Sequence, residues 1–254
     1  MNYWFDEYNL MKKAKKHNKF VEEIYHKQIL VCVETTRIYN PIFECTEAAV
    51  DIETTICLDD LDSVSAIYKH ADGRTAVLNF ASYKNPGGGF LAGSSAQEEA
   101  LCHESILYSV LSRLMDKYYK WNHFNKNREL YLNRGLYTPA VCFIHDGKEK
   151  FCDVITVAAP NKKVATRYQN VTSEENYEVL RDRIKFVLDI AKDNKVDTLI
   201  LGAYGCGVFG QDPMEVASIF KELLTTTHKC FKKVVFSIPD KTGRSYRAFE
   251  QYYH

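Results

Sequence analysis

Short apolar segments alternate with helical patterns along most of the chain, and this alternation restricts the fold more than any other feature of the sequence. Four β-prone runs are bounded by polar residues, as buried strands are: residues 76–80, 153–158, 197–204 and 232–238. Apolar residues at helical spacing follow Gln97 and recur between Tyr177 and Ala191. Strands that alternate with helices predict a three-layer α/β domain.

A further helix is predicted within "QDPMEVASIFKELL". Asp212 can cap its first turn, Pro213 fits the first helical position, and Glu215 has the spacing of a capping box. In α/β sheets, ligands bind beyond the carboxyl ends of the strands. We therefore expect the functional residues in the loops that follow the strands.

No repeat, low-complexity tract or flexible linker divides the 254 residues, so we predict one domain, 1–254. Lys plus Arg (33) equals Asp plus Glu (33), which gives no indication of a stable nucleic-acid partner. The first twenty residues lack the apolar core of a signal peptide, and no apolar run approaches the roughly eighteen residues of a spanning helix. We expect a cytoplasmic monomer with no membrane association.

Two stretches, 7–28 and 108–132, are polar, aromatic and basic by turns. They could be read as nucleic-acid surfaces, but acids are interleaved with the cations and the aromatics recur at helical spacing, which favours solvated amphipathic helices. The eight cysteines are scattered without a CxxC pair or a zinc-like spacing. We therefore predict reduced thiols, no metal site and no cofactor.

The first glycine-rich loop is "NPGGGFLAGSSAQEEA", residues 85–100. Three consecutive glycines offer backbone N–H groups that no side chain obstructs, and they can adopt positive φ and approach a ligand closely. A flexible turn seldom needs three glycines, so we expect this loop to contact a phosphate or a ribose.

The second glycine-rich loop is "LGAYGCGVFGQDP", residues 201–213. Gly205, Gly207 and Gly210 formally match a dinucleotide fingerprint, but no acidic residue follows at the end of a next strand, so we exclude a Rossmann oxidoreductase. A glycine-rich turn that leads into a capped helix still suits a diphosphate. Phe209 is either an aromatic face toward the ligand or a core plug beneath the loop, and the spacing does not decide between them.

Gln97, Glu98 and Glu99 stand at the start of a helix, between the two loops. Neighbouring helical residues point about 100° apart, so the two acids cannot share one role. We expect one to face the ligand and the other to brace it. A carboxyl that Phe90 or Phe209 partly desolvates, beside a like charge, would have its pKa raised toward the range of a general acid.

Three motifs in this order resemble the microbial-type poly(ADP-ribose) glycohydrolases, a branch of the macrodomain family. They are "LNFASYKNPGGGFLAGSSAQEEALC", "VITVAAPN" and "LGAYGCGVFGQDP", and seven residues separate the triple glycine from Gln-Glu-Glu. The similarity extends from about Val33 to Asp240. It implies a macrodomain-like three-layer α/β/α sandwich with a central mixed sheet, preceded by an N-terminal helical extension of about residues 1–32.

The resemblance implies a hydrolase that cuts the ribose–ribose O-glycosidic bond of poly(ADP-ribose) and releases ADP-ribose, with Glu99 as the general acid/base and Glu98 positioning the ribose. It also implies these substrate-binding residues: Asn85, Gly87, Gly88, Gly89, Gln97, Gly205, Cys206, Gly207, Val208, Phe209 and, more weakly, Asn161. The partner would be ADP-ribose or its polymer on modified proteins.

Some positions depart from the family pattern. His103 and Glu104 follow "ALC" where Arg is expected, and Thr138 and His145 stand where Ser and Arg are expected. Two other functions remain open: removal of a single ADP-ribose from a protein or nucleobase, and binding of ADP-ribose without cleavage. The intact acidic pair argues against a pure binding module, because a second carboxylate near an anionic ligand is costly.

Overall fold

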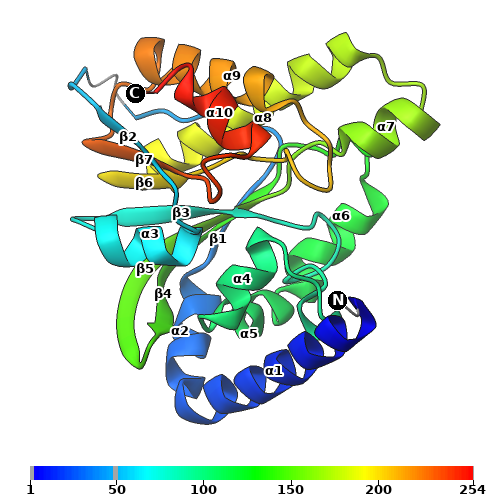
Figure 1. Ribbon diagram of the computed structural model, residues 1–254, viewed down its shortest axis with the longest axis vertical. Helices are drawn as coiled ribbons and strands as arrows, with labels where there is room; N and C mark the ends of the chain where they lie inside the picture. The colour runs from blue at the N-terminus through cyan, green and yellow to red at the C-terminus, as the bar shows by residue number, and fades with distance from the viewer. Residues whose placement is uncertain (1–2, 48–50, 254) are drawn as a thin grey trace.

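In the computed structural model, which describes residues 3–47 and 51–253, seven strands form one mixed sheet in the order β1-β4-β5-β3-β6-β7-β2 (Figure 1). Five neighbouring strands run parallel, whereas β4 is antiparallel to both β5 and β1. The strands are β1 Arg37–Tyr39, β2 Thr55–Asp59, β3 Thr75–Phe80, β4 Gly135–His145, β5 Lys148–Val157, β6 Thr198–Leu201 and β7 Lys233–Ser237. The predicted mixed central sheet is confirmed.

Helices cover both faces of the sheet, which makes the three layers (Figure 1). One face carries α8, α9 and α10, and the other carries α1 to α5. The helices are α1 Tyr3–Ile24, α2 His26–Thr35, α3 Ser63–His70, α4 Gln97–His103, α5 Leu107–Ser112, α6 Lys120–Phe124, α7 Lys162–Tyr168, α8 Ser173–Asp193, α9 Pro213–Thr226 and α10 Arg244–Glu250. No helix within 3–47 and 51–253 is long and apolar enough to cross a membrane.

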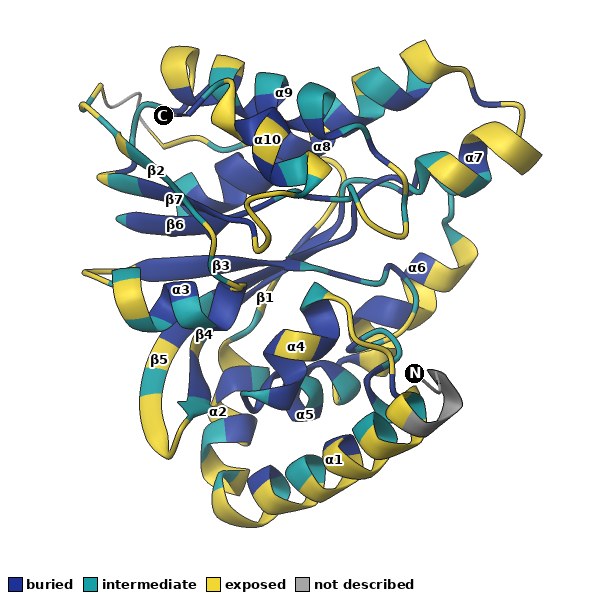
Figure 2. Ribbon diagram, in the orientation of Figure 1, coloured by how far each residue is buried: buried dark blue, intermediate teal, exposed yellow. Residues whose placement is uncertain are grey.

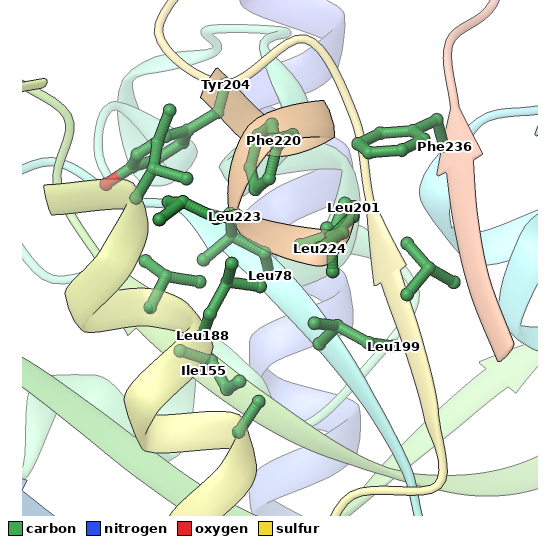
Figure 3. Close-up of a cluster of buried hydrophobic side chains, with 14 of the residues drawn as sticks. Leu78, Ile155, Leu188, Leu199, Leu201, Tyr204, Phe220, Leu223, Leu224 and Phe236 are labelled. Atoms are coloured by element: carbon green, nitrogen blue, oxygen red, sulfur yellow. The ribbon is translucent and has the colours of Figure 1, made fainter. Parts of the chain in front are cut away.

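The central strands carry apolar side chains on both sides because each face of the sheet has its own core. Leu78 packs under α8 and α9, whereas its neighbour Val77 packs against α3 and the N-terminal helices. Figure 3 shows Leu78 and Leu199 among side chains of the first core, and Figure 2 shows the buried strands between exposed outer helix faces. Burial on both sides explains why these strands read as continuous apolar runs.

The apolar spacing after Gln97 predicts a helix, but the structure does not form one continuous helix there. The segment breaks into shorter helices, α4 and α5. After α4, Ser105 forms an isolated bridge with Phe143 of β4, and its hydroxyl donates to the Leu101 carbonyl at 2.6 Å. α5 then begins, and a π-helical turn, Met115–Tyr119, precedes α6. The side-chain bonds of Ser105 thus replace the helical ladder where α4 ends.

Other local predictions can be compared with the structure. The N-terminal helical extension is confirmed as α1 and α2, which end at Thr35. Asp212 caps α9 and Pro213 begins it, but Glu215 closes no capping box, because its carboxylate accepts from Lys162 at 3.2 Å. The sequence analysis missed the β4–β5 hairpin, in which Asp146 and Gly147 have positive φ as a tight turn requires.

Candidate active site

The loop after β3 brings its glycines directly against the carboxyl groups at the start of α4. Gly87 and Gly88 have φ of +67° and +58°, where side chains are rarely tolerated. A Cβ on Gly88 would lie 2.5 Å from Glu99 Oε1 and 3.0 Å from Glu98 Oε2. Glycine is required here because both carboxyl groups occupy the space of a side chain.

Glu99 is held by the backbone of its own loop. Its Oε1 accepts from the Gly89 N–H at 2.7 Å, and its Oε2 accepts from the Ala96 N–H at 3.1 Å. The residue is only 5% exposed, and this remaining surface lines a hollow beside the start of α1, together with Asp6 and Glu7. The carboxyl is therefore fixed in orientation while it still reaches the cleft.

Glu98 faces the interior. Its Oε1 accepts from Asn79 Nδ2 at 3.1 Å, and its Oε2 accepts from the Ser82 N–H at 2.7 Å. Burial raises the pKa of Glu98 to about 8, and the neighbouring charge of Glu99 adds to the rise, against the lowering effect of the two hydrogen bonds. At neutral pH Glu98 thus favours its protonated form, which limits repulsion within the acidic pair.

Gln97 joins this loop to the sheet. Its side chain accepts from the Phe80 N–H at 2.9 Å and donates to the Leu78 carbonyl at 2.8 Å. The amide therefore bonds to the last residues of β3, beyond the part of the strand that pairs with β6. The same side chain lines the cavity described below. This arrangement places the start of α4 at the carboxyl end of the strand.

The second glycine loop follows β6 and is much more open. Gly205 has φ of +75° and packs closely on Ala159 and Gln211. A Cβ on Gly207, by contrast, would meet nothing within 4 Å, and Val208 is 75% exposed. The tip of this loop therefore offers its backbone to a ligand, while its base is anchored in the protein.

Three adjoining hollows lie around the start of α4 and the second glycine loop. The central one, about 320 Å³, is lined by Phe80, Ala96, Gln97, Ala159, Ala203, Tyr204, Gly205, Gly207, Val208 and Phe209. It shares Ala96 and Val208 with the hollow at Glu99. It shares Phe80, Gln97 and Ala203 with a hollow of about 300 Å³ that reaches Asp62 and Pro239. All three hollows have Ala96 in their lining, so they adjoin one another and form one cleft, with Glu99 on the wall of one of them.

The structure places most of the predicted residues in or beside this cleft. Gly88 and Gly89 contact Glu99, and Gln97, Gly205, Gly207, Val208 and Phe209 line the central hollow.

Asn85, Asn161 and Cys206 are predicted residues that neither line the described hollows nor contact the acidic pair. Asn85 is exposed on the loop, Asn161 caps α7, and burial raises the pKa of Cys206 to about 12.

A stack of aromatic rings beneath the loops was not predicted. Tyr83 and Tyr131 stack with centroids 4.2 Å apart and 11° between the planes, and Phe209 meets Tyr131 edge-on at 6.1 Å. Phe209 thus packs on buried rings, and it also lines the central hollow, which leaves its predicted contact with a ligand possible in this geometry. The stack joins the first glycine-rich loop, the second glycine-rich loop and the segment before β4.

Tyr131 belongs to a turn in which Asn127, Arg128 and Glu129 also have left-handed backbone. Such a run is costly for residues with side chains and persists only where its surroundings impose it. The buried Arg183 guanidinium imposes it here, because it donates to the Leu130 and Ala158 carbonyls and to Asn133 Oδ1. The turn is therefore part of the framework behind the site.

The residues that depart from the family pattern line none of the three hollows. His103 is buried edge-on against Phe90, with centroids 4.8 Å apart, and neither ring nitrogen has a hydrogen-bond partner in the described residues. Burial lowers the pKa of His103 to about 4, and nearby Lys13 adds to the effect. His145 lies 3.4 Å from Glu104 at the end of β4, away from the hollows.

No group of three or more His, Cys, Asp or Glu side chains that could hold a metal ion occurs within 3–47 and 51–253. The fold and the site together define a macrodomain-like α/β protein with a paired-carboxylate cleft. Comparison with known proteins narrows this class. Residues 9–146 match the model of the family described as "Microbial-type PARG, catalytic domain". The chain belongs to this family of microbial-type poly(ADP-ribose) glycohydrolases (PARGs).

Solved structures agree with this assignment. The PARG of Thermomonospora curvata superposes with a TM-score of 0.87 at 30% identity, over 97% of this chain and 100% of that one. The same enzyme bound to the inhibitor ADP-HPD gives 0.83 at 28% identity, over 96% and 99%. The PARG of Deinococcus radiodurans in complex with ADP-ribose gives 0.80 at 30% identity, over 88% and 95%. No curated protein sequence matches the chain.

Proposed function

We propose that the protein hydrolyses the ribose–ribose O-glycosidic bond of poly(ADP-ribose) and releases ADP-ribose. The observation that carries the proposal is Glu99, a carboxyl fixed by two backbone N–H groups on the wall of the cleft. Family membership and the likeness to PARG structures that hold ADP-ribose or an inhibitor support the same activity.

The three adjoining hollows could accommodate the diphosphate, the terminal ribose and the adenosine of ADP-ribose. We call the open glycine loop, Gly205 to Gly210, the diphosphate loop. It would hold the diphosphate with backbone N–H groups such as those of Gly207 and Val208, which donate to no carbonyl in the described part of the chain. The terminal ribose would then lie toward Glu99, and the adenosine would extend into the hollow between Asp62 and Pro239. Binding at the diphosphate would thereby fix the distance between the ribose and the acid, so positioning supplies much of the rate.

In the proposed reaction, protonated Glu99 donates its proton to the leaving oxygen while C1″ develops oxocarbenium character. The resulting carboxylate then takes a proton from the attacking water, which restores the acid and forms the second product. Glu98 does not transfer a proton in this scheme. Its raised pKa keeps it neutral beside Glu99, and its fixed position orients the ribose hydroxyls.

We further propose that the chain acts as a monomeric, single-domain enzyme of the cytoplasm. All eight cysteines are free, as reducing compartments favour. The catalytic and diphosphate loops come from distant parts of one continuous sheet, so the site needs nearly the whole chain.

The test compares wild type with Glu99→Gln on two substrates, a poly(ADP-ribosyl)ated and a mono(ADP-ribosyl)ated protein. Removing a general acid should lower polymer turnover by about 10³-fold and leave ADP-ribose affinity nearly unchanged. Release from the mono-modified protein alone would indicate a mono(ADP-ribosyl) hydrolase. Tight ADP-ribose binding without release from either substrate would indicate a binding module.

A further inference from the structure

A strongly basic surface lies on two segments that contribute no catalytic group. Residues 115–128 and 162–168 together hold seven Lys or Arg side chains and a single acid, a net charge of +6 in a chain whose total is zero. We call these cations and the aromatic residues among them the α6–α7 surface. Its cations are Lys117, Lys120, Lys126, Arg128, Lys162, Lys163 and Arg167.

The two segments form one continuous surface. The Asn161 N–H, at the start of α7, donates to the Glu129 carbonyl just after the first segment, at 3.0 Å. Beneath them, Leu130 packs against Ala165 of α7 in a small buried cluster. Figure 1 shows α6 and α7 on the same side of the molecule, and these contacts join them.

Some of these cations form ion pairs with carboxylates, and others do not. Lys120, Arg128 and Lys162 have carboxylate partners within 4 Å. Lys163 and Arg167 are exposed and have no such partner in the described part of the chain. Unpaired exposed cations add little to stability, so their concentration here is better explained by an anionic ligand.

Exposed aromatic rings lie among the cations. Phe124 is 84% exposed and Tyr168 is 64% exposed, and the Arg167 guanidinium lies over the Tyr168 ring, 5.2 Å from its centroid. Cations interspersed with exposed rings suit a flexible chain that carries both phosphates and bases, since the rings can stack on bases.

The surface is connected to the cleft at two points. The Lys163 N–H donates to the Phe209 carbonyl of the diphosphate loop at 3.0 Å. Lys84, next to the catalytic glycines, lies 3.7 Å from Glu129 at the edge of the first segment. The hollow at Glu99 has the acidic Asp6 and Glu7 on another wall, which would repel phosphates. A polyanion that leaves the cleft is therefore attracted toward α6 and α7.

We propose that the α6–α7 surface binds the part of the poly(ADP-ribose) chain that continues beyond the scissile bond. The inference rests on the proposed function, because that chain is the leaving group of the reaction. Each of its units carries a diphosphate for Lys163 and Arg167 and an adenine for Tyr168 or Phe124. The surface would thus retain the shortened polymer for the next cleavage, without taking part in the chemistry.

The test uses the double variant Lys163→Gln/Arg167→Gln on an ADP-ribose dimer and on long polymer. Loss of two phosphate contacts should raise KM for long polymer by about 5- to 10-fold. The slope of log KM against the logarithm of the salt concentration should also decrease by about two. kcat, and KM for the dimer, should stay at wild-type values. The control is Lys16→Gln/Lys27→Gln, which removes two exposed cations from the N-terminal helices and should change neither substrate.

A binding measurement separates failure of this inference from failure of the proposed function. In the Glu99→Gln background, the affinity for long polymer is measured with and without the double substitution. An unchanged affinity would overturn the inference whether or not wild type cleaves polymer. Equal loss for long polymer and for free ADP-ribose would also overturn it, because the two side chains would then belong to the cleft. Single-stranded DNA of matched length that binds as tightly as poly(ADP-ribose) would overturn it as well, because the surface would then be a nucleic-acid site.

Discussion

The two glycine-rich loops of the cleft use glycine for opposite purposes. In the catalytic loop, glycine makes room for the protein's own side chains, since a Cβ on Gly88 would collide with both carboxyl groups. In the diphosphate loop, no protein atom needs the space beside glycine, since a Cβ on Gly207 would meet nothing within 4 Å. The acid is thus fixed before substrate arrives, whereas the anion seat completes its contacts only with substrate.

Substitution of Gly88 should give the largest effect. Gly88→Ala places a methyl group 2.5 Å from Glu99 Oε1 at a φ of +58°, so the carboxyl must move. We expect kcat to fall by roughly 10²-fold or more, because catalytic geometry tolerates little displacement. ADP-ribose affinity, measured by calorimetry, should fall much less. Equal losses in kcat and in affinity would show that the two loops are not separable, and circular dichroism checks that the variant is folded.

The Glu98→Gln variant tests the buried side of the catalytic loop. The folded pKa of Glu98, about 8, lies above the ordinary glutamate pKa of 4.5, so native stability should decline as pH rises from about 4.5 to about 8. A neutral glutamine removes this decline, and Asn79 Oδ1, buried without a partner, can accept from its amide. We expect Tm at pH 8 to exceed that of wild type by on the order of 5 °C, with little difference at pH 4.5. Parallel Tm curves for the two proteins would contradict the assignment.

His103→Leu should have a smaller effect, of opposite sign in pH. The folded pKa of His103, about 4, lies below the ordinary histidine pKa of 6.5, so stability should fall as pH drops from about 6.5 to about 4. Leucine fills the site against Phe90 without a titratable group. We expect a Tm gain of roughly 3 °C at pH 4.5 and a smaller change at pH 7.5. A Tm difference that does not vary with pH would indicate a pure packing effect.

Gly207→Ala should change least. Its backbone lies outside the left-handed region, and the added methyl group points into open space. We expect kcat and KM within about twofold of wild type, in line with most surface substitutions. Gly205→Ala is the matched contrast, since its Cβ would lie 2.8 Å from Ala159 at a φ of +75°. A large KM increase for Gly207→Ala would mean that the bound ligand leaves no room even for a methyl group.

The sequence predicted the features that follow from local pattern. Buried parallel strands, the cap of α9 by Asp212 and the placement of both glycine loops at strand ends are all visible in spacing and composition. The β4–β5 hairpin was missed although "HDGKEK" contains a turn signal, because its strands are partly polar on the exposed side.

The aromatic stack could not be predicted, because Tyr83, Tyr131 and Phe209 meet only in three dimensions. The partner of Glu98 did leave a trace. Asn79 is a fully buried amide within an apolar strand, and such a residue needs a polar neighbour. The left-handed turn at residues 127–131 could not be predicted from local sequence, because the buried Arg183 that bonds to it lies about fifty residues further along the chain.

The strand order has a consequence for how the protein is made on the ribosome. β2 occupies one edge of the sheet, and within the described residues its only strand neighbour is β7, which ends at Ser237. The hollow that reaches Asp62 also needs Pro239. The emerging polypeptide therefore carries its acidic pair and catalytic glycines long before the opposite wall of the cleft exists. The complete cleft can form only after the residues up to Pro239 have been synthesised, so a product that terminates before them would lack this wall.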